Sequence, residues 1–336
     1  MIEAVSRPHH TNFPDWAAEK PEVVVLTGDL TRPCELGLFR DRFPERTFSM
    51  GMAEQNMIGF AGGMAREGLA PYVHTFGVFI ARRTLDQIEM SVAYPNLPVK
   101  MLGFLPGIST PGGATHQAID DMAIMRTLPN MTVLETGDAT EVESMLDVAH
   151  AVNGPVYVRV LRGTMRRLFP KDEPMKLNQA RVLGRGGDVA LITSGICTEE
   201  ALLATQALAE RGVGIQHLHI STLKPFDDPA VLETVLAARR GVVTMENHLT
   251  TGGLGSAVAE MMTTNGAGGR QIRLGLQDTY AHGATQAYLM RLHGMDARAL
   301  VGAVEDLYSD RFGVDDEELA EARLIDAHET FKSEAL

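Results

Sequence analysis

A glutamate stands at the start of a segment whose spacing is typical of an amphipathic helix. On an α-helix, Glu54 shares a face with Ile58, Ala61 and Ala65. A carboxyl group on that apolar face is unfavourable unless it is neutralised or hydrogen-bonded, and a protonated acid in a dry pocket can donate a hydrogen bond to a ligand. The alternative is a structural glutamate that bonds to backbone amides or pairs with an arginine. This segment alone leaves both interpretations open.

Two aromatic residues follow in the segment His74-Thr-Phe-Gly-Val-Phe79. A strand end followed by a helix start would project the rings of Phe76 and Phe79 into the same crevice. Aromatic faces suit stacking on a flat heteroaromatic ligand. Taken without Glu54, both rings would be interpreted as ordinary core residues.

A Gly/Pro-rich loop ends in Gly112-Gly-Ala-Thr-His-Gln117 and is predicted to lead into a helix. We expect His116 at the start of that helix, where an imidazole can donate hydrogen bonds to substrate oxygens or exchange protons with them. Further on, Arg159 and Arg162 flank the end of a predicted strand, and guanidinium groups suit phosphate or another oxyanion. Because Arg159 alternates with Tyr157, only one of the two arginines need face a site.

The elements that must position these residues alternate between strand and helix. Predicted strands cover residues 23–26, 47–49, 71–75, 99–104, 131–135 and 156–160, and predicted helices cover residues 53–67, 79–93 and 141–152. A second α/β unit is predicted from strands at 188–193, 214–220, 242–245 and 272–275, helices at 199–211 and 255–263, and a charged helical tail. This alternation predicts two doubly wound α/β domains with mostly parallel sheets. We expect domains at 1–165 and 186–336, joined by a Pro-, Lys- and Asp-rich linker at 166–185.

Bulk composition excludes several classes of protein. The chain has 336 residues, 45% of them hydrophobic, and lacks an apolar stretch near the roughly 20 residues that a membrane span needs. A net charge of −13 disfavours nucleic acid as the main ligand. Cys34 and Cys197 fall in different predicted domains, which argues against a disulfide framework and favours a reducing cytoplasm. We therefore expect a cytoplasmic protein without membrane or nucleic-acid partners.

In this order, the Ala-Glu-Gln helix start, the Thr-Phe-x-x-Phe segment and the Thr-His-Gln turn resemble transketolases and 1-deoxyxylulose-5-phosphate synthases. The resemblance implies that Glu54 hydrogen-bonds N1′ of the aminopyrimidine of thiamine diphosphate, with Phe76 and Phe79 packed around that ring. Asp29 and Leu30, after the first strand, correspond to an Asp-Leu pair near the thiazolium.

The same resemblance implies that His116 contacts the sugar substrate. It also implies that Arg159 or Arg162 binds the substrate phosphate. Arg7 is a more speculative third cation. Some positions depart from the family pattern and make the pocket less polar, namely Gly112, Phe104, Leu105 and Pro33. We therefore expect an unusual sugar acceptor rather than a standard pentose phosphate.

The resemblance covers nearly the whole chain but only the second and third domains of a full-length transketolase. The Gly-Asp-Gly segment with a downstream Asn, which holds Mg²⁺ and the diphosphate, does not occur, so no metal ligand is assigned to this chain. The resemblance thus implies a split transketolase in which a separate diphosphate-binding chain completes an α2β2 assembly. Two alternatives remain, namely the β-subunit of a 2-oxoacid dehydrogenase decarboxylating component and a non-catalytic scaffold subunit.

Overall fold

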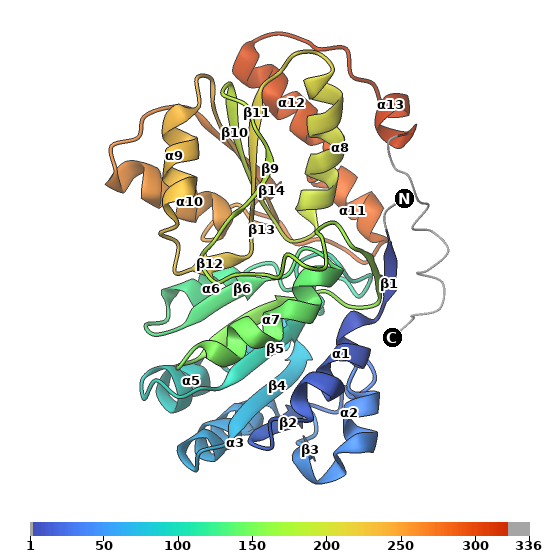
Figure 1. Cartoon of the computed structure of the whole chain (residues 1–336), viewed down its shortest axis with the longest axis vertical. Coiled ribbons are helices and arrows are strands. Elements are labelled where there is room, and N and C mark those ends of the chain that lie inside the picture. The colour runs from blue at the N-terminus through green and yellow to red at the C-terminus, as the bar shows by residue number, and fades with distance from the viewer. Residues whose placement is uncertain (1–2, 322–336) are drawn as a thin grey trace.

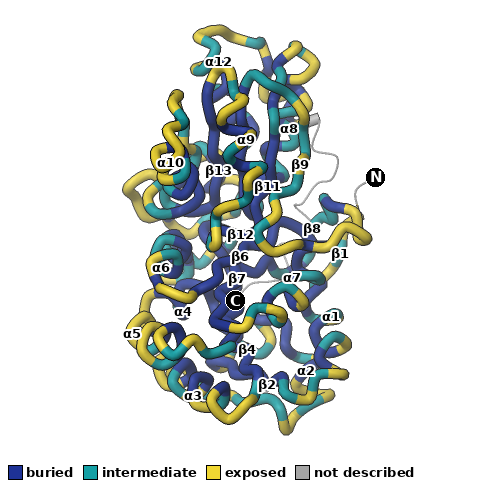
Figure 2. Tube along the Cα trace, turned by 60° about the vertical axis from the view of Figure 1, so that its left-hand side comes forward, coloured by how far each residue is buried: buried dark blue, intermediate teal, exposed yellow. Residues whose placement is uncertain are grey.

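Runs of apolar residues form the central strands of two α/β units that are stacked along the long axis of the molecule (Figure 1). The computed structural model describes residues 3–321. Both units have mostly parallel sheets, which confirms the predicted fold class. The central strands of both sheets are among the most deeply buried parts of the trace (Figure 2).

The first unit contains a seven-stranded sheet in the order β12-β6-β7-β5-β4-β2-β3. Its strands are β2 (Val23–Thr27), β3 (Thr47–Ser49), β4 (Ala70–Phe76), β5 (Lys100–Phe104), β6 (Thr132–Glu135), β7 (Val156–Val160) and β12 (Thr222–Lys224). All neighbours are parallel except β12, which is antiparallel to β6. The edge strand β12 therefore comes from the later half of the chain.

Helices cover both faces of this sheet because alternate strand residues point to opposite sides. Val24 and Leu26 of β2 pack with α3, whereas Val23 and Val25 pack with α1 and α7. The helices of this unit are α1 (Pro8–Ala17), α2 (Gly37–Arg42), η1 (Pro44–Arg46), α3 (Glu54–Arg66), α4 (Gly77–Arg83), α5 (Leu85–Ile88), the π-helical turn η2 (Glu89–Ala93), α6 (Asp121–Thr127) and α7 (Ala139–Ala151).

The second unit contains a five-stranded sheet in the order β14-β13-β10-β11-β9. Its strands are β9 (Arg181–Gly184), β10 (Val189–Ser194), β11 (Ile215–Ile220), β13 (Gly241–Leu249) and β14 (Gln271–Leu276). Its helices are α8 (Cys197–Ala209), α9 (Pro229–Ala237), α10 (Leu254–Thr264), α11 (Gln286–Leu292), α12 (Ala297–Tyr308) and α13 (Asp316–Glu321). A separate two-stranded ribbon pairs β1 (Ala4–Ser6) with β8 (Thr164–Arg166).

Several elements differ from the sequence-based expectation. The helix predicted at 79–93 is divided into α4, α5 and η2, and the break falls at Thr84, whose backbone leaves the helical region and whose hydroxyl donates to Ile80 O at 2.6 Å. Helix α1 was not predicted because its surface is polar, yet it buries Phe13 and Ala17. The expected linker contains β9, which already pairs with β11 of the second sheet. The final residues of the predicted helical tail, 322–336, lie outside the described residues.

A fully buried arginine at the end of β7 joins the two units. The Arg159 guanidinium donates from Nε to Asp121 at 2.9 Å and from Nη1 to Glu135. Its Nη2 donates to Ala118 O at 2.9 Å and to Asn247 O of the second unit at 3.0 Å. Burial opposes the charge on Arg159, but the two carboxylates outweigh burial and raise its pKa.

A second buried contact joins the units through α7. His219 Nε2 lies 3.0 Å from Glu141 Oε2, and Arg181 donates to the other carboxylate oxygen at 3.2 Å. Burial opposes ionisation of Glu141, but His219 and Arg181 outweigh it and lower the pKa of this carboxyl group. The interface between the units is therefore held by paired charges as well as by apolar packing.

We predict that Arg159→Met destabilises the protein by about 3–5 kcal/mol, because Asp121 and Glu135 would remain buried without their cation. The control is Arg239→Met, which removes an exposed ion pair with Asp188 and should cost about 1 kcal/mol or less. Urea unfolding of the isolated chain measures both. Equal losses for the two variants would contradict the structural role of Arg159.

Helix α3 provides a second prediction, with two adjacent glycines as a matched pair. A Cβ added at Gly62 would lie 2.6 Å from Ser91 O, whereas a Cβ at Gly63 would meet nothing within 4 Å. We expect Gly62→Ala to destabilise the isolated chain by about 1–3 kcal/mol because η2 must shift. Gly63→Ala should leave thermal stability unchanged or raise it, since alanine favours the helix. The prediction is contradicted if Gly63→Ala loses stability and Gly62→Ala does not.

Candidate cofactor and substrate site

The first residue of α3 is the predicted carboxylate. Glu54 is 3% exposed, and the residues expected on its face, Ile58, Ala61 and Ala65, are buried in the core against β2 and β4. Its Oε2 accepts a hydrogen bond from Arg83 Nη1 at 3.2 Å. The sequence left open whether Glu54 pairs with an arginine. The structure of the single chain contains that ion pair, with Arg83.

A buried hydroxyl faces the same glycine as this carboxyl group and was missed by the sequence reasoning. A Cβ added at Gly28 would lie 3.7 Å from both Glu54 Oε1 and Thr75 Oγ1. Thr75 Oγ1 is buried and has no hydrogen-bond partner among residues 3–321. An unpaired buried hydroxyl is costly, so a polar ligand group at this point would satisfy it. The available signal was its position at the end of β4, next to Phe76.

The predicted aromatic residues and histidine come together at the same edge of the sheet. The ring centroids of Phe76 and Phe79 are 5.6 Å apart, and the His116 ring packs edge-on against them at 6.0 and 5.6 Å. The Arg83 guanidinium lies over the Phe79 ring, 4.1 Å from its centroid, so Arg83 contacts both the aromatic cluster and Glu54. The three rings and the carboxylate are therefore one connected group of side chains.

His116 does not begin a helix, contrary to the expectation. It lies in a turn closed by its own backbone N–H, which donates to Gly113 O at 2.9 Å, and α6 begins only at Asp121. Thr115 Oγ1 lies 2.9 Å from His116 Nδ1. Because Thr115 contacts Nδ1 and the residue is partly exposed, a ligand would reach this imidazole through Nε2.

Asp29 and Leu30 follow β2 at the edge of the sheet that carries Thr75 and Phe76. In the register between β2 and β4, Thr27 pairs with His74. Asp29 is exposed and has a left-handed backbone with φ 64°, and Leu30 N donates to Thr27 Oγ1 at 3.2 Å. The turn is therefore tied to the strand end beside the aromatic cluster. Ligands of open parallel sheets commonly bind at such carboxyl ends.

The two candidate arginines have different surroundings. The Arg159 guanidinium is fully buried and is bonded to four acceptors of the protein, so its donors are already used within the chain. Arg162 is half-buried, and its Nη1 donates to Pro33 O at 3.0 Å in the segment that follows the Asp29–Leu30 turn. Between the two residues, only Arg162 remains a candidate for an anionic substrate.

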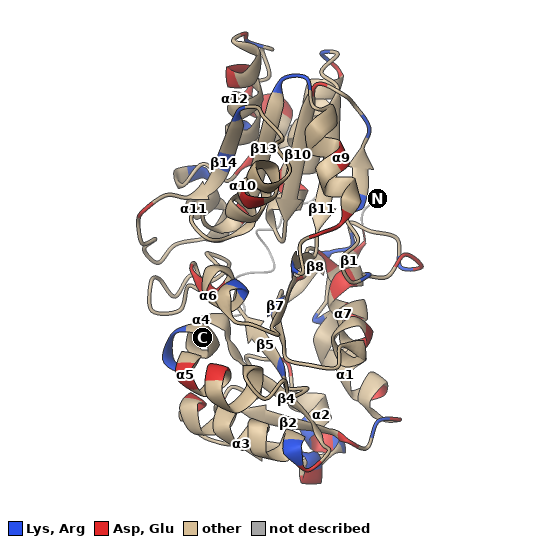
Figure 3. Cartoon of the chain, turned by 90° about the vertical axis from the view of Figure 1, so that its left-hand side faces the viewer, with Lys and Arg blue, Asp and Glu red and all other residues tan. Residues whose placement is uncertain are grey.

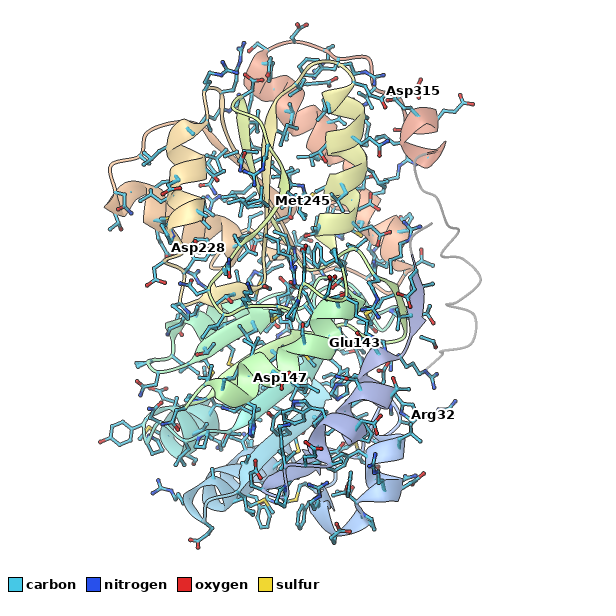
Figure 4. All side chains as sticks on the ribbon, in the orientation of Figure 1. Arg32, Glu143, Asp147, Asp228, Met245 and Asp315 are labelled. Atoms are coloured by element: carbon cyan, nitrogen blue, oxygen red, sulfur yellow. The ribbon has the colours of Figure 1, made fainter. Side chains whose placement is uncertain are left out.

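A cavity of about 280 Å³ lies in the same region. Its lining combines several cations with one carboxylate and consists of Arg7, His10, Thr31, Arg32, Glu35, Gly37 and Arg40. The Glu35 carboxylate accepts from Gly163 N at 2.7 Å and from His10 N at 3.3 Å. Arg32 lies on the outer side of the first unit (Figure 4), and charges of both signs gather around α2 (Figure 3). The cavity suits a small anion near the chain surface.

The described residues, 3–321, contain no group of three or more His, Cys, Asp or Glu side chains able to hold a metal ion. In that same part of the chain, no helix is both long enough and apolar enough to cross a membrane.

Comparison with known proteins connects this geometry to a family. Residues 10–167 match the family described as "Transketolase, pyrimidine binding domain", and residues 178–300 match "Transketolase, C-terminal domain". The chain is 38% identical to the 6-deoxy-6-sulfo-D-fructose transketolase subunit SqwH of Clostridium sp. (strain MSTE9), over 87% of this chain and 91% of that protein. It is 34% identical to a 1-deoxy-D-xylulose-5-phosphate synthase of Syntrophus aciditrophicus (strain SB), but spans only 45% of that enzyme.

A solved structure described as "Split gene transketolase, inactive beta4 tetramer" is also similar, with a TM-score of 0.82 and 35% identity over 90% of this chain and 97% of that one. The match includes both units and nearly the whole of that subunit. The buried carboxylate, the aromatic pair and the histidine turn thus stand in a chain that belongs to the transketolase family.

Proposed function

We propose that this chain is the pyrimidine-binding and C-terminal subunit of a split transketolase that transfers a two-carbon ketol unit between sugars. The observation that carries the proposal is the convergence of the Glu54 carboxyl group, the unpaired Thr75 hydroxyl and the rings of Phe76 and Phe79. These groups fit the aminopyrimidine of thiamine diphosphate, which is flat and carries hydrogen-bonding nitrogens. Asp29 and Leu30 would lie toward the thiazolium.

Thiamine diphosphate, when bound, supplies the carbon that adds to a ketose carbonyl and the ring that accepts the electron pair of the broken C–C bond. The chain's own residues bind and orient the reactants. Glu54 would hydrogen-bond the pyrimidine nitrogen, and the apolar surroundings of α3 would strengthen that hydrogen bond. His116 donates a hydrogen bond to the substrate oxygens or exchanges a proton with them. Its contacts with both phenylalanine rings fix the imidazole at the site.

A second chain completes the site in this proposal. The sequence lacks the Gly-Asp-Gly segment, so the partner would bring Mg²⁺ and the diphosphate-binding loop. A partner chain is supported by similarity to a subunit of a split-gene transketolase, whose β4 tetramer is described as inactive. The stoichiometry proposed for the complete enzyme is α2β2. In isolation this chain is expected to associate with itself and to be inactive in the same way.

The substrate is proposed to be a sugar with an anionic end. Arg162, Arg7 and the cations around the cavity beside the Asp29–Leu30 turn support this assignment. The similar Clostridium protein is named for 6-deoxy-6-sulfo-D-fructose, so a sulfonate and a phosphate are both candidates for the anionic group. Guanidinium groups bind either oxyanion.

Glu54→Ala should lower ketol transfer by about 100-fold or more in the chain assembled with its diphosphate-binding partner, because the carboxyl group proposed to hydrogen-bond the pyrimidine would be lost. Glu67→Gln, a change at the exposed end of the same helix, is the control and should retain full activity. The measurement is steady-state transfer from a ketose donor to an aldose acceptor. Activity that survives in Glu54→Ala would favour a non-catalytic scaffold.

Arg162→Met should raise the KM for a phosphorylated or sulfonated donor by about tenfold, since a charge-assisted hydrogen bond is worth roughly 1.5–3 kcal/mol. The KM for the corresponding uncharged ketose should not change. Arg42→Met, which removes an exposed pair with Asp15 on the neighbouring helix, serves as the control. A parallel rise for charged and uncharged donors would show that Arg162 acts on the fold and not on the anion.

A second candidate reaction is condensation of the synthase type, favoured by the 34% identity to a 1-deoxy-D-xylulose-5-phosphate synthase. In that reaction the product would be 1-deoxy-D-xylulose 5-phosphate and not a ketose made by ketol transfer. Product analysis on the same two-chain complex distinguishes the two reactions.

A further inference from the structure

The second unit has no role in the proposed chemistry, yet it contacts the loop that carries His116 along its length. This loop, residues 105–118, runs from the end of β5 to the segment before α6. It is defined here as the His116 loop. Its internal bonds close local turns, and they include Gly107 N to Ala118 O at 2.8 Å, Ser109 N to Pro106 O at 3.1 Å and His116 N to Gly113 O at 2.9 Å. How the loop is placed against the aromatic cluster depends in addition on what packs against it.

The beginning of the His116 loop is held by Asn247 of β13. Asn247 is 1% exposed, its Oδ1 accepts from Ile108 N at 2.9 Å, and its Nδ2 donates to Pro106 O at 2.9 Å. A primary amide has both a donor and an acceptor, so it satisfies one backbone group on each side of Gly107. Gly107 has φ 53°, and a Cβ there would lie 2.1 Å from Asn247 Oδ1. The two residues fit only as a pair.

The tip of the loop is held by the turn at His282 and Gly283, which precedes α11. A Cβ added at Gly283 would lie 2.7 Å from Pro111 O, so the two backbones are already in contact. Gln117 next to His116 is fully buried, and its Nε2 lies 3.4 Å from both Thr110 O and His282 O. Gln117 therefore links the first half of the loop, at Thr110, to the second unit, at His282.

The end of the loop is tied to the same strand. Leu249 N donates to Ile119 O at 2.8 Å, and Arg159 Nη2 bridges Ala118 O and Asn247 O. Residues of β13 and the turn before α11 thus fix the loop at its beginning, tip and end.

We propose that Asn247 and Gly283 are positioning residues for His116, and that the second domain serves the reaction by fixing the His116 loop against Phe76 and Phe79. This assignment rests on the proposed function only where it concerns catalysis. The effect on the loop itself follows from contacts within this chain and is measurable without a substrate or a partner.

The first experiment measures amide hydrogen exchange of the full chain by mass spectrometry. Asn247→Ala and Gly283→Ala should each speed exchange by about tenfold or more in the peptide that covers residues 105–118. Asn247→Ala removes the partners of Ile108 N and Pro106 O, and the Cβ of Gly283→Ala would push Pro111 O away. Gly302→Ala, within α12 and with nothing within 4 Å of the added Cβ, is the control and should not alter this peptide. Unchanged exchange of the loop in both test variants would overturn the proposal.

The second experiment is a double-mutant cycle in the chain assembled with its diphosphate-binding partner. Gly283→Ala should lower kcat/KM by about 10- to 100-fold, since a displacement near 1 Å of a catalytic group can have that effect. In a His116→Ala background the same change should lower kcat/KM by no more than about twofold, because both act through one imidazole. Asn247→Ala should give the same pattern. An equally large loss in both backgrounds would contradict a role through His116.

The two experiments separate the two proposals. If the assembled wild type shows no transfer activity while exchange of the His116 loop responds as expected, the proposed function fails and the positioning of the loop stands. If activity is present and neither exchange nor the cycle responds, the positioning fails alone. Should Asn247→Ala not fold, Gly283→Ala carries both comparisons.

Discussion

The need to place a carboxyl group on an apolar helix face organises the first unit. Glu54 is nearly buried at the start of α3, where a lone charge would be destabilising. Arg83 compensates by pairing with it, and that same arginine lies across Phe79. The aromatic cluster, the unpaired Thr75 hydroxyl and the turn after β2 all meet at this point. Each becomes understandable once a flat polar ligand is expected beside Glu54.

The second unit fixes the position of segments of the first unit through buried contacts. Arg159 connects Asp121 and Glu135 with backbone oxygens from both units. Because a buried cation needs all of these partners, the units cannot shift relative to one another without breaking strong contacts. Asn247, whose backbone oxygen accepts from Arg159, also holds the His116 loop through its side-chain hydrogen bonds. The domain interface and the active-site loop are therefore parts of one buried network.

Much of the architecture was predictable because alternating apolar strands and amphipathic helices leave a clear periodicity. The fold class and the face of Glu54 followed from local spacing, and the family from the resemblance of three short motifs. The surroundings of Arg159 did not, since an arginine two positions from Tyr157 looks the same whether it meets a substrate or two distant carboxylates. The pairing of β12 with β6 and the helix α1 were missed for a similar reason. They depend on contacts between segments far apart in sequence, which no local pattern encodes.

His116 shows the same limit within a motif. The Thr-His-Gln turn identified the residue, but its place in a turn before α6 depends on Gly113, Gln117 and the second unit. Departures such as Gly112 and Phe104 also acquire a structural meaning. Gly112 leaves room for the His116 ring, since a Cβ there would lie 2.9 Å from its Cβ, and Phe104 packs with His9 and His74.

The central claim is that this chain forms half of a thiamine-diphosphate site, and calorimetric titration tests it most directly. Thiamine diphosphate with Mg²⁺ is titrated into this chain alone and into its mixture with a chain that carries the Gly-Asp-Gly segment. The account predicts saturable binding in the mixture and none in the chain alone. Absence of binding in the mixture, with both chains folded and associated, would contradict it.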